Sequence, residues 1–305
     1  GMKAAANSRA GTAGSMRLRR RFLGAAAALA ASRVLAAPAK LPPFRIGTTA
    51  VILDDQLGFL HAWRDYLQPR LGRPVAFMQR GSYREITSLL AADELDFAWI
   101  CGYPYVRNKA MLELVALPNF AGKPLYRSYL IVPAADGATR DFGSLSGRVF
   151  AYSDPDSNSG FLVPQYEMLR TGIDPQSHFR KAFFTYAHRN VVRAVAEGLA
   201  DGGAVDGYVW ETLALRSPQL TSRTRVAHLS DEYGFPPIGA RRSIEASARE
   251  RFRQTLLAMS GEPEGRRLLA ELNLEGFLPP DESRFAGIAR AFDYVAARER
   301  LPTQS

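Results

Sequence analysis

The segment Ser157-Asn158-Ser159-Gly160 groups two hydroxyls, an amide and a glycine directly ahead of the apolar run FLVPQYEMLR. A helix N-cap needs only one such side chain, so the segment carries more donors than capping uses. Side-chain donors and free backbone N–H groups at a helix start form a favourable place for an anion. The pattern therefore predicts an anion site, and ordinary helix capping is the alternative interpretation.

Short β-rich runs alternate with helical patterns on both sides of this segment. The first series predicts strands at 44–51, 74–79 and 95–100 and helices at 59–72 and 83–93. The second predicts strands at 128–133, 148–153, 181–186 and 203–210, with helices that begin at Gly160 and at His188-Arg189. The chain after Ser243 reads as mostly helical. This alternation is typical of an α/β fold with largely parallel strands.

Two segments repeat one plan. Tyr83 begins a helix and Asp96 opens the next strand thirteen residues later, while His188 and Asp201 are separated by the same interval. We therefore expect two similar α/β lobes. Ligands of open α/β sheets bind at the carboxyl ends of the strands, where the strand-to-helix loops lie. Tyr83, His188 and the 157–160 segment all occupy such loops, so two facing lobes would bring them into one cleft.

The formal net charge of +9 is concentrated at the N-terminus. Residues 1–39 hold seven basic side chains and no acid, which leaves 32 basic and 30 acidic residues in 40–305. A nearly neutral body lacks the basic surface that nucleic-acid binding requires. The charge balance therefore excludes a nucleic-acid partner.

The basic segment has the layout of an export signal. Residues 16–39 read MRLRRRFLGAAAALAASRVLAAPA, and 19–23 fit the twin-arginine pattern R-R-x-F-L. We expect residues 1–39 to be a cleaved signal with a tag remnant at Gly1, and the mature protein to lie in the periplasm. A disordered basic tail is the alternative. The apolar stretch is too short for a transmembrane helix, and no cysteine lies near the cleavage region, so no stable membrane anchor is expected.

The stretch FAYSDPDSNSGFLVPQYEMLRTGIDPQSHF, followed by Ala187-His188, resembles the periplasmic phosphate/phosphite/phosphonate-binding family. Members of that family show a DP-x-S-[ST]-S-G-x-LVP segment and a later G-H or A-H pair. LDFAWICGYPYVRNKAM and PLYRSYLIV also look like their counterparts, and the similarity covers nearly all of 44–280. The resemblance implies an α/β, two-lobed type II periplasmic binding (Venus-flytrap) fold with mostly parallel sheets, flanking helices and a helical C-terminal tail. Lobe 1 would comprise 40–127 and 230–305, and lobe 2 would comprise 128–229.

The resemblance also implies a function and a binding site. Such a protein captures a small oxyanion for an ABC transporter permease. Carried over by position, the oxyanion pocket falls on Tyr83, Tyr126, Ser157, Asn158, Ser159 and His188, with Cys101, Arg127, Gly160, Asp206 and Tyr208 as further candidates. Hydroxyls, an amide and helix N–H groups would donate to the oxygens, and a His188 imidazolium would neutralise charge. Asp206 would hold either His188 or Tyr83 in place.

Two departures from the family pattern bear on the ligand. Asn158 stands where Ser or Thr is usual. Amino-phosphonate binders place two carboxylates around the ligand's ammonium, and Tyr208 and Pro236 stand at the matching positions here. A compact oxyanion such as phosphite, phosphate or methylphosphonate is therefore expected rather than an aminoalkyl phosphonate.

Several alternatives remain open. Tyr83 and Tyr126 also fit as core aromatics, and His188 as a surface histidine at a helix start. Cys101, the only cysteine, fits inert packing or a soft ligand. In the second case the protein resembles periplasmic arsenite sensors that signal to a membrane histidine kinase. No G-x-S-x-G, H-E-x-x-H or cysteine–histidine metal pattern is present, so neither an enzyme nor a cofactor or metal is expected.

Overall fold

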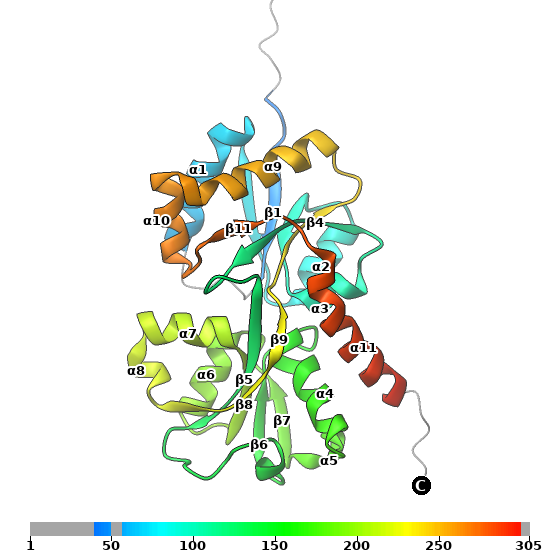
Figure 1. Cartoon of the computed structure of the whole chain (residues 1–305), viewed down its shortest axis with the longest axis vertical. Helices are drawn as coiled ribbons and strands as arrows, with labels where there is room; N and C mark the ends of the chain where they lie inside the picture. The colour runs from blue at the N-terminus through cyan, green and yellow to red at the C-terminus, as the bar shows by residue number, and fades with distance from the viewer. Residues whose placement is uncertain (1–39, 50–56, 300–305) are drawn as a thin grey trace, which may run out of the picture. The chain divides into compact units, whose positions relative to one another are not determined.

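The computed structural model of the chain describes residues 40–49 and 57–299. The export signal predicted at 1–39 lies outside the described residues. Residues 40–305 form one compact unit, within which the strands sort into two separate sheets (Figure 1). Among the described helices, none combines the length and the apolar character that crossing a membrane requires.

The first sheet has six strands in the order β11-β4-β10-β3-β1-β2. Its strands are β1 (Phe44–Thr48), β2 (Val75–Gln79), β3 (Phe97–Trp99), β4 (Leu112–Asn119), β10 (Ile238–Arg241) and β11 (Gly276–Leu278). Its helices are α1 (Leu57–Leu71), α2 (Tyr83–Ala91), α3 (Gly102–Arg107), α9 (Ala246–Ala258) and α10 (Pro263–Glu271), with the short turns η3 (Met259–Gly261) and η4 (Glu282–Phe285). Large aromatic side chains fill its core: Trp63 lies with its ring 6.1 Å from Trp99 and 5.3 Å from Phe77. Aromatic burial of this kind dominates core energetics.

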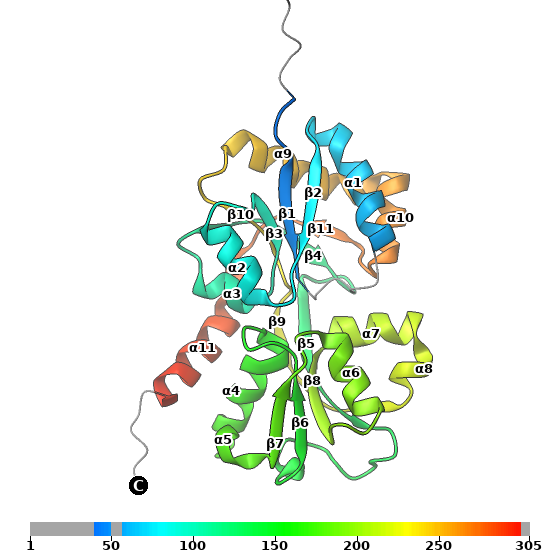
Figure 2. The ribbon, with the colours of Figure 1, turned by 180° about the vertical axis from the view of Figure 1, so that it is seen from behind.

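The second sheet has five strands in the order β7-β6-β8-β5-β9. Its strands are β5 (Leu125–Pro133), β6 (Val149–Tyr152), β7 (Lys181–Phe184), β8 (Gly202–Asp206) and β9 (Thr224–Gly234). Its helices are α4 (Val163–Arg170), α5 (Pro175–His178), α6 (His188–Ala196), α7 (Gly207–Arg216) and α8 (Pro218–Thr221), with the turns η1 (Gly143–Leu145) and η2 (Asn158–Leu162). The chain passes between the two sheets twice, from β4 to β5 and from β9 to β10 (Figure 2).

Both sheets are mixed. The β1–β2, β1–β3, β6–β7 and β6–β8 pairs are parallel, as the alternation of strands and helices predicts. The strands on either side of the two crossings run the other way: β10 is antiparallel to β3 and β4, and β5 is antiparallel to β8 and β9.

The strand predicted at 203–210 is wrong beyond Asp206. The strand β8 ends there, and α7 begins at Gly207. The Asp206 carboxylate accepts the backbone N–H of Val209 at 3.1 Å, which is the bond of a helix N-cap. A Cβ on Gly207 would lie 2.5 Å from the Tyr129 ring and 2.8 Å from the Arg127 carbonyl. The turn into α7 therefore needs glycine at this position.

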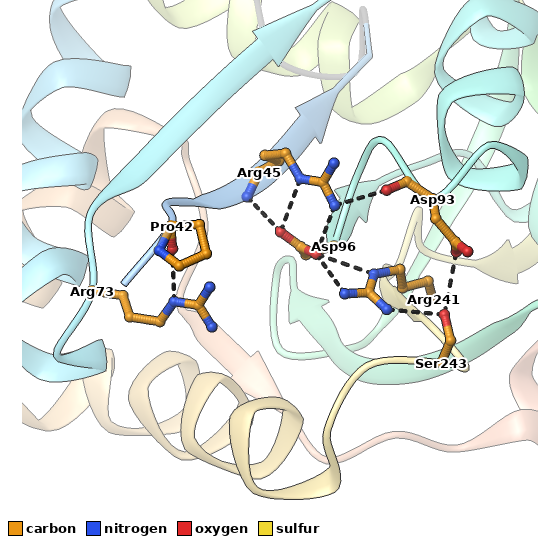
Figure 3. Close-up of polar contacts among 7 residues, drawn as sticks. All are labelled: Pro42, Arg45, Arg73, Asp93, Asp96, Arg241 and Ser243. Atoms are coloured by element: carbon orange, nitrogen blue, oxygen red, sulfur yellow. Dashed lines mark hydrogen bonds and ion pairs between the residues drawn. The ribbon is translucent and has the colours of Figure 1, made fainter. Parts of the chain in front are cut away.

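The thirteen-residue repeat corresponds to one structural device used twice. Asp96 accepts the backbone N–H of Arg45 on β1 at 2.9 Å, and Asp201 accepts that of Val149 on β6 at the same distance. Asp96 also receives the guanidiniums of Arg45 and Arg241, which ties β1 to β10 (Figure 3). Burial alone would raise the pKa of Asp96, but these hydrogen bonds outweigh it and lower the pKa. Each carboxylate thus holds an inner strand of its sheet, β1 for Asp96 and β6 for Asp201.

The C-terminal helix α11 (Ala286–Glu299) contacts elements beside both sheets. It packs on α3 next to the first sheet and on α4 next to the second (Figure 1). Tyr294 on α11 meets Tyr166 on α4 edge to face, with ring centroids 5.2 Å apart. The helix therefore adds an apolar connection between the two halves of this unit.

Candidate functional site

The segment after β6 starts the π-helical turn η2, which leads directly into α4. Ser157 caps it, because its Oγ accepts the backbone N–H of Gly160 at 2.9 Å. Ordinary capping accounts for that residue alone. Asn158 Oδ1 and Ser159 Oγ are buried and have no hydrogen-bond partner among the described residues. Buried polar atoms are rarely left unpaired, so these two atoms call for a partner from outside the described residues.

Position 160 requires glycine because the end of β6 lies close to it. A Cβ at this position would lie 1.7 Å from Ser153 Oγ and 3.0 Å from Ser157 Oγ. Only glycine therefore lets η2 pack against the end of β6. Ser153 Oγ is itself buried and without a partner in the described chain.

Tyr126 reaches the same turn from β5. Its hydroxyl accepts a hydrogen bond from Asn158 Nδ2 at 3.0 Å. The side chain is buried, and burial raises its pKa well above the ordinary value, so the hydroxyl keeps its proton. Its oxygen accepts from Asn158, and its O–H can donate either to the neighbouring Cys101 sulfur or to a ligand.

His188 and Tyr83 bring together the first residues of α6 and α2, one beside each sheet. The Tyr83 hydroxyl lies 3.1 Å from His188 Nε2. On the other side of the ring, Nδ1 accepts the backbone N–H of Asp206 at 3.0 Å. An N–H donor at Nδ1 places the imidazole proton on Nε2, so the ring donates to the Tyr83 oxygen. The Tyr83 O–H is then a second available donor.

The expectation of an imidazolium is wrong for this arrangement. His188 is buried, and burial lowers its pKa from the ordinary value to about 3. Protonation of Nδ1 would also break the hydrogen bond from Asp206. His188 is therefore a neutral donor, and it supplies geometry rather than charge.

Asp206 acts on this cluster through its backbone. Its N–H holds His188, while its carboxylate caps α7, so of the two expected roles the structure has the one toward His188. The side chain is buried, which raises its pKa to about 7. Burial therefore brings the pKa of the Asp206 carboxyl close to neutral pH.

Cys101 also joins the cluster. It occupies the N-cap position of α3, and its Sγ accepts the backbone N–H of Asn158 at 3.2 Å. The side chain is buried, and burial raises the pKa of the thiol to about 12. Cys101 is therefore an uncharged thiol, whereas the form of cysteine that acts as a soft ligand is the thiolate.

Two of the further candidates lie outside the cluster. The Arg127 guanidinium donates to the Ser230 carbonyl and to Glu232 at 3.1 Å, and the side chain is partly exposed. Neighbouring residues of a strand point to opposite faces, so Tyr126 inside places Arg127 outside. The Tyr208 hydroxyl donates to the Leu272 carbonyl, and its ring packs on Phe235. Neither side chain has a free group at the site.

The cluster is rich in neutral donors and contains no buried cation. Among the described residues, the buried polar side chains include no Lys or Arg, and the undescribed segment 50–56 has neither residue type. No group of three or more His, Cys, Asp or Glu residues suited to a metal ion occurs in the described ranges. The arrangement can therefore hold a small oxyanion by hydrogen bonds alone.

The family model described as "ABC transporter, phosphonate, periplasmic substrate-binding protein" matches residues 56–285. The chain belongs to this family. Among its relatives is the phosphate-import protein PhnD of Mycolicibacterium smegmatis, which is 26% identical over 159 residues. That match covers 48% of this chain and 50% of the relative, so the chain spans about half the relative's length.

Two solved structures share the fold. A binding protein component of an ABC phosphonate transporter from Pseudomonas aeruginosa is 20% identical with a TM-score of 0.78, and the match covers 86% of this chain and 91% of that chain. PhnD1 from Prochlorococcus marinus, solved in complex with methylphosphonate, is 18% identical with a TM-score of 0.76, and the match covers 83% and 98%. These likenesses confirm the two-lobed periplasmic-binding-protein fold.

Three polar residues beside this cluster, Thr48, Ser153 and Asp154, were not predicted as site residues from the sequence. Thr48, the last residue of β1, has a buried hydroxyl without a partner in the described chain, as Ser153 has after β6. Asp154 accepts the backbone N–H of Tyr83 at 3.0 Å and so links η2 to the start of α2. The position of Thr48 at the carboxyl end of a parallel strand was the signal that would have identified it.

Proposed function

We propose that this protein is a periplasmic solute-binding protein that captures a small phosphorus oxyanion for import by an ABC transporter permease. The observation that carries the proposal is the buried set of donors at the start of η2. Ser159 Oγ lacks a hydrogen-bond partner among the described residues, and the hydroxyls of Tyr83 and Tyr126 each accept one hydrogen bond and stay protonated. Convergent neutral donors in a dry site are well suited to a compact oxyanion.

Capture proceeds by closure of the two halves over the anion. The oxyanion binds first at η2, and closure brings Tyr83 against His188. Charged contacts beside the site support the closed form: Asp156 pairs with Arg107 at 3.3 Å and with Arg84 at 3.6 Å. Because the side chains of Arg84 and Arg107 are exposed to solvent, each pair contributes only about 0.2–1 kcal/mol. Closure therefore depends mainly on the ligand and the buried contacts.

The ligand is a compact anion such as phosphite, phosphate or methylphosphonate. An aminoalkyl phosphonate needs a carboxylate for its ammonium. Tyr208 donates to Leu272, the Pro236 carbonyl is used by the Trp99 indole, and the Asp206 carboxylate caps α7. The Asp154 carboxylate accepts the backbone N–H groups of Tyr83 and Asp156. No carboxylate among the described residues of this cluster is therefore left for a primary amine, and aminoethylphosphonate is expected to bind weakly.

The protein is proposed to bind rather than to catalyse, and to be exported by residues 1–39. A sensory role for arsenite or a related oxyanion, read by a histidine kinase, would require Cys101 as a ligand. Its Sγ already accepts the Asn158 N–H and its pKa is raised to about 12, which favours a positioning role. Binding of phosphorus oxyanions and transport are therefore the preferred interpretation.

An anion panel on the full chain tests the proposal. Thermal midpoints are measured with phosphite, phosphate, methylphosphonate, aminoethylphosphonate, sulfate and arsenite. A ligand that binds only the folded state raises the midpoint as its concentration exceeds the dissociation constant. We expect shifts with one or more of the compact phosphorus oxyanions and none with arsenite. A shift with arsenite alone would overturn the proposal.

A further inference from the structure

One of the unpaired polar atoms of the proposed anion site, among the described residues, is an acceptor and so is of the wrong kind for an anion. Asn158 donates through Nδ2 to the Tyr126 hydroxyl, and its backbone N–H is used by Cys101. Its carbonyl oxygen Oδ1 is buried and has no partner in the described chain. Because Oδ1 and Nδ2 share one carbon, this acceptor lies beside the Tyr126 hydroxyl, among the donors. A fully ionised oxyanion offers only acceptors and would leave Oδ1 unpaired, at a cost in affinity.

The charge of the surroundings points the same way. His188 is held neutral by the Asp206 N–H at Nδ1, and no Lys or Arg is buried among the described residues. A second negative charge on the ligand would therefore enter a dry site without a counter-ion. A single charge shared among neutral donors suits this environment better.

We propose that the site binds the singly charged, protonated form of its phosphorus oxyanion, with the P–OH proton donated to Asn158 Oδ1. This inference rests on the proposed function and adds the protonation state of the ligand. Asn158 then acts as a specificity-determining residue. It favours anions that carry a P–OH group over anions of equal size and charge that carry none.

The matched ligands for the test are methylphosphonate and methanesulfonate. In acidic buffer both are single anions of nearly the same shape, and only methylphosphonate has a proton to donate. Calorimetric titration of the full chain at about pH 5 is expected to show methylphosphonate binding at least about tenfold more tightly, since methanesulfonate leaves a buried acceptor unpaired. Equal affinities would contradict the role of Oδ1.

The second arm varies the pH. Above the second pKa of the ligand, the fraction of ligand in the singly charged form falls about tenfold per pH unit. The apparent affinity should drop by the same factor. Other groups facing the ligand are Tyr83 and Cys101 from the first half, and Tyr126, His188, Asp154 and Asp206 from the second. Burial keeps the tyrosines, the thiol and the imidazole neutral between about pH 5 and pH 8.5. Burial also raises the pKa of Asp154 above its ordinary value and that of Asp206 to about 7, so the Asp206 carboxyl titrates in this range.

The charged groups near them are already engaged. Arg84 and Arg107 pair with Asp156, Arg127 pairs with Glu232, and Arg189 on α6 is half-buried. Comparing the pH dependence of binding for two ligands distinguishes protonation of the ligand from protonation of Asp154 and Asp206. Phosphite loses its second proton at lower pH than methylphosphonate does, so the affinity loss should begin at lower pH for phosphite. A midpoint that is the same for both ligands would assign the pH dependence to the protein and overturn the inference.

The variant test uses Asn158→Ser, which replaces the carboxamide by a hydroxyl that can donate or accept. We expect the preference for methylphosphonate over methanesulfonate to shrink by about tenfold, with the thermal midpoint recorded to confirm folding. Asn108→Ser is the control, because Asn108 bonds the Pro104 carbonyl in α3 and lies outside the site. If no anion binds the wild type at any pH, the proposed function fails. If methylphosphonate binds more tightly as pH rises, only the protonation inference fails.

Discussion

The Tyr83 hydroxyl lies 3.1 Å from Nε2 of His188, across the boundary between the two sheets. Each residue opens a helix, α2 beside the first sheet and α6 beside the second, and each is buried. The Asp206 N–H at Nδ1 fixes the direction of this hydrogen bond and leaves the Tyr83 proton free for a ligand. A chain of uncharged hydrogen-bonding groups therefore connects the two halves of the proposed site.

His188 is expected to contribute as a neutral hydrogen-bond donor. His188→Gln keeps an N–H near Tyr83 and should weaken oxyanion binding by less than about tenfold, whereas His188→Ala leaves buried groups unpaired and should cost roughly 10- to 100-fold. Calorimetric titration with phosphite measures both. Equal losses in the two variants would indicate that a positive charge on His188 supplied the affinity.

Asp206 should make stability depend on pH. Its pKa rises from 3.8 in the unfolded chain to about 7 in the folded protein. The stabilising effect of the bound proton is complete below the unfolded pKa and is lost as pH rises through the folded one. Asp206→Asn can still cap α7 and carries no charge at any pH. The free energy of unfolding of this variant, relative to the wild type, should increase by on the order of 1–3 kcal/mol from about pH 5 to about pH 8. Urea unfolding at the two values tests this, and a constant difference would contradict it.

Gly160 is expected to be intolerant of a side chain. In Gly160→Ala the new Cβ would lie 1.7 Å from Ser153 Oγ, so η2 must move away from β6. Overpacking of this kind costs about 1–3 kcal/mol, and ligand binding should weaken together with stability. Gly137→Ala is the control, because a Cβ there meets no atom within 4 Å. Equal thermal midpoints for the two variants would show that the turn is less constrained than described.

Cys101 should be inert. A buried thiol with its pKa raised to about 12 reacts slowly with a thiol reagent near neutral pH until the protein unfolds. Cys101→Ser should keep phosphite affinity within about threefold and lower the thermal midpoint by a few degrees. Rapid labelling of the folded wild type, or an arsenite response that disappears in the variant, would instead favour the sensory interpretation.

Local patterns were enough to predict much of the fold. The α/β alternation and the thirteen-residue repeat both reflect short-range periodicity, and both are found in the structure. The antiparallel strands β9 and β10 depend on pairings between residues more than ninety positions apart, which no local pattern reports. The segment GAVDGYVW reads as one apolar strand, but the Asp206 cap starts a helix in its middle.

The site was predicted in part for the same reason. Its members come from a motif, and the structure brings Tyr83, Tyr126, Asn158 and His188 into contact with one another in pairs. Whether they bind an anion stays a prediction. Arg127 was placed there because it follows Tyr126, although strand alternation turns it outward. The charge of His188 depends on a backbone N–H eighteen residues away, so its residue type alone could not reveal it.

The most direct test of the account uses Ser159→Ala. The Ser159 hydroxyl is buried and has no partner in the part of the chain that the structure describes. Its removal should therefore leave stability unchanged or slightly higher, while phosphite or methylphosphonate binding weakens by at least about tenfold. Ser128→Ala is the comparison, because that hydroxyl bonds the Ser159 carbonyl and its loss should lower stability. Calorimetric titration and thermal unfolding of the two variants give the answer. Weaker binding at full stability in Ser159→Ala would support an oxyanion site at η2, and unchanged affinity would contradict it.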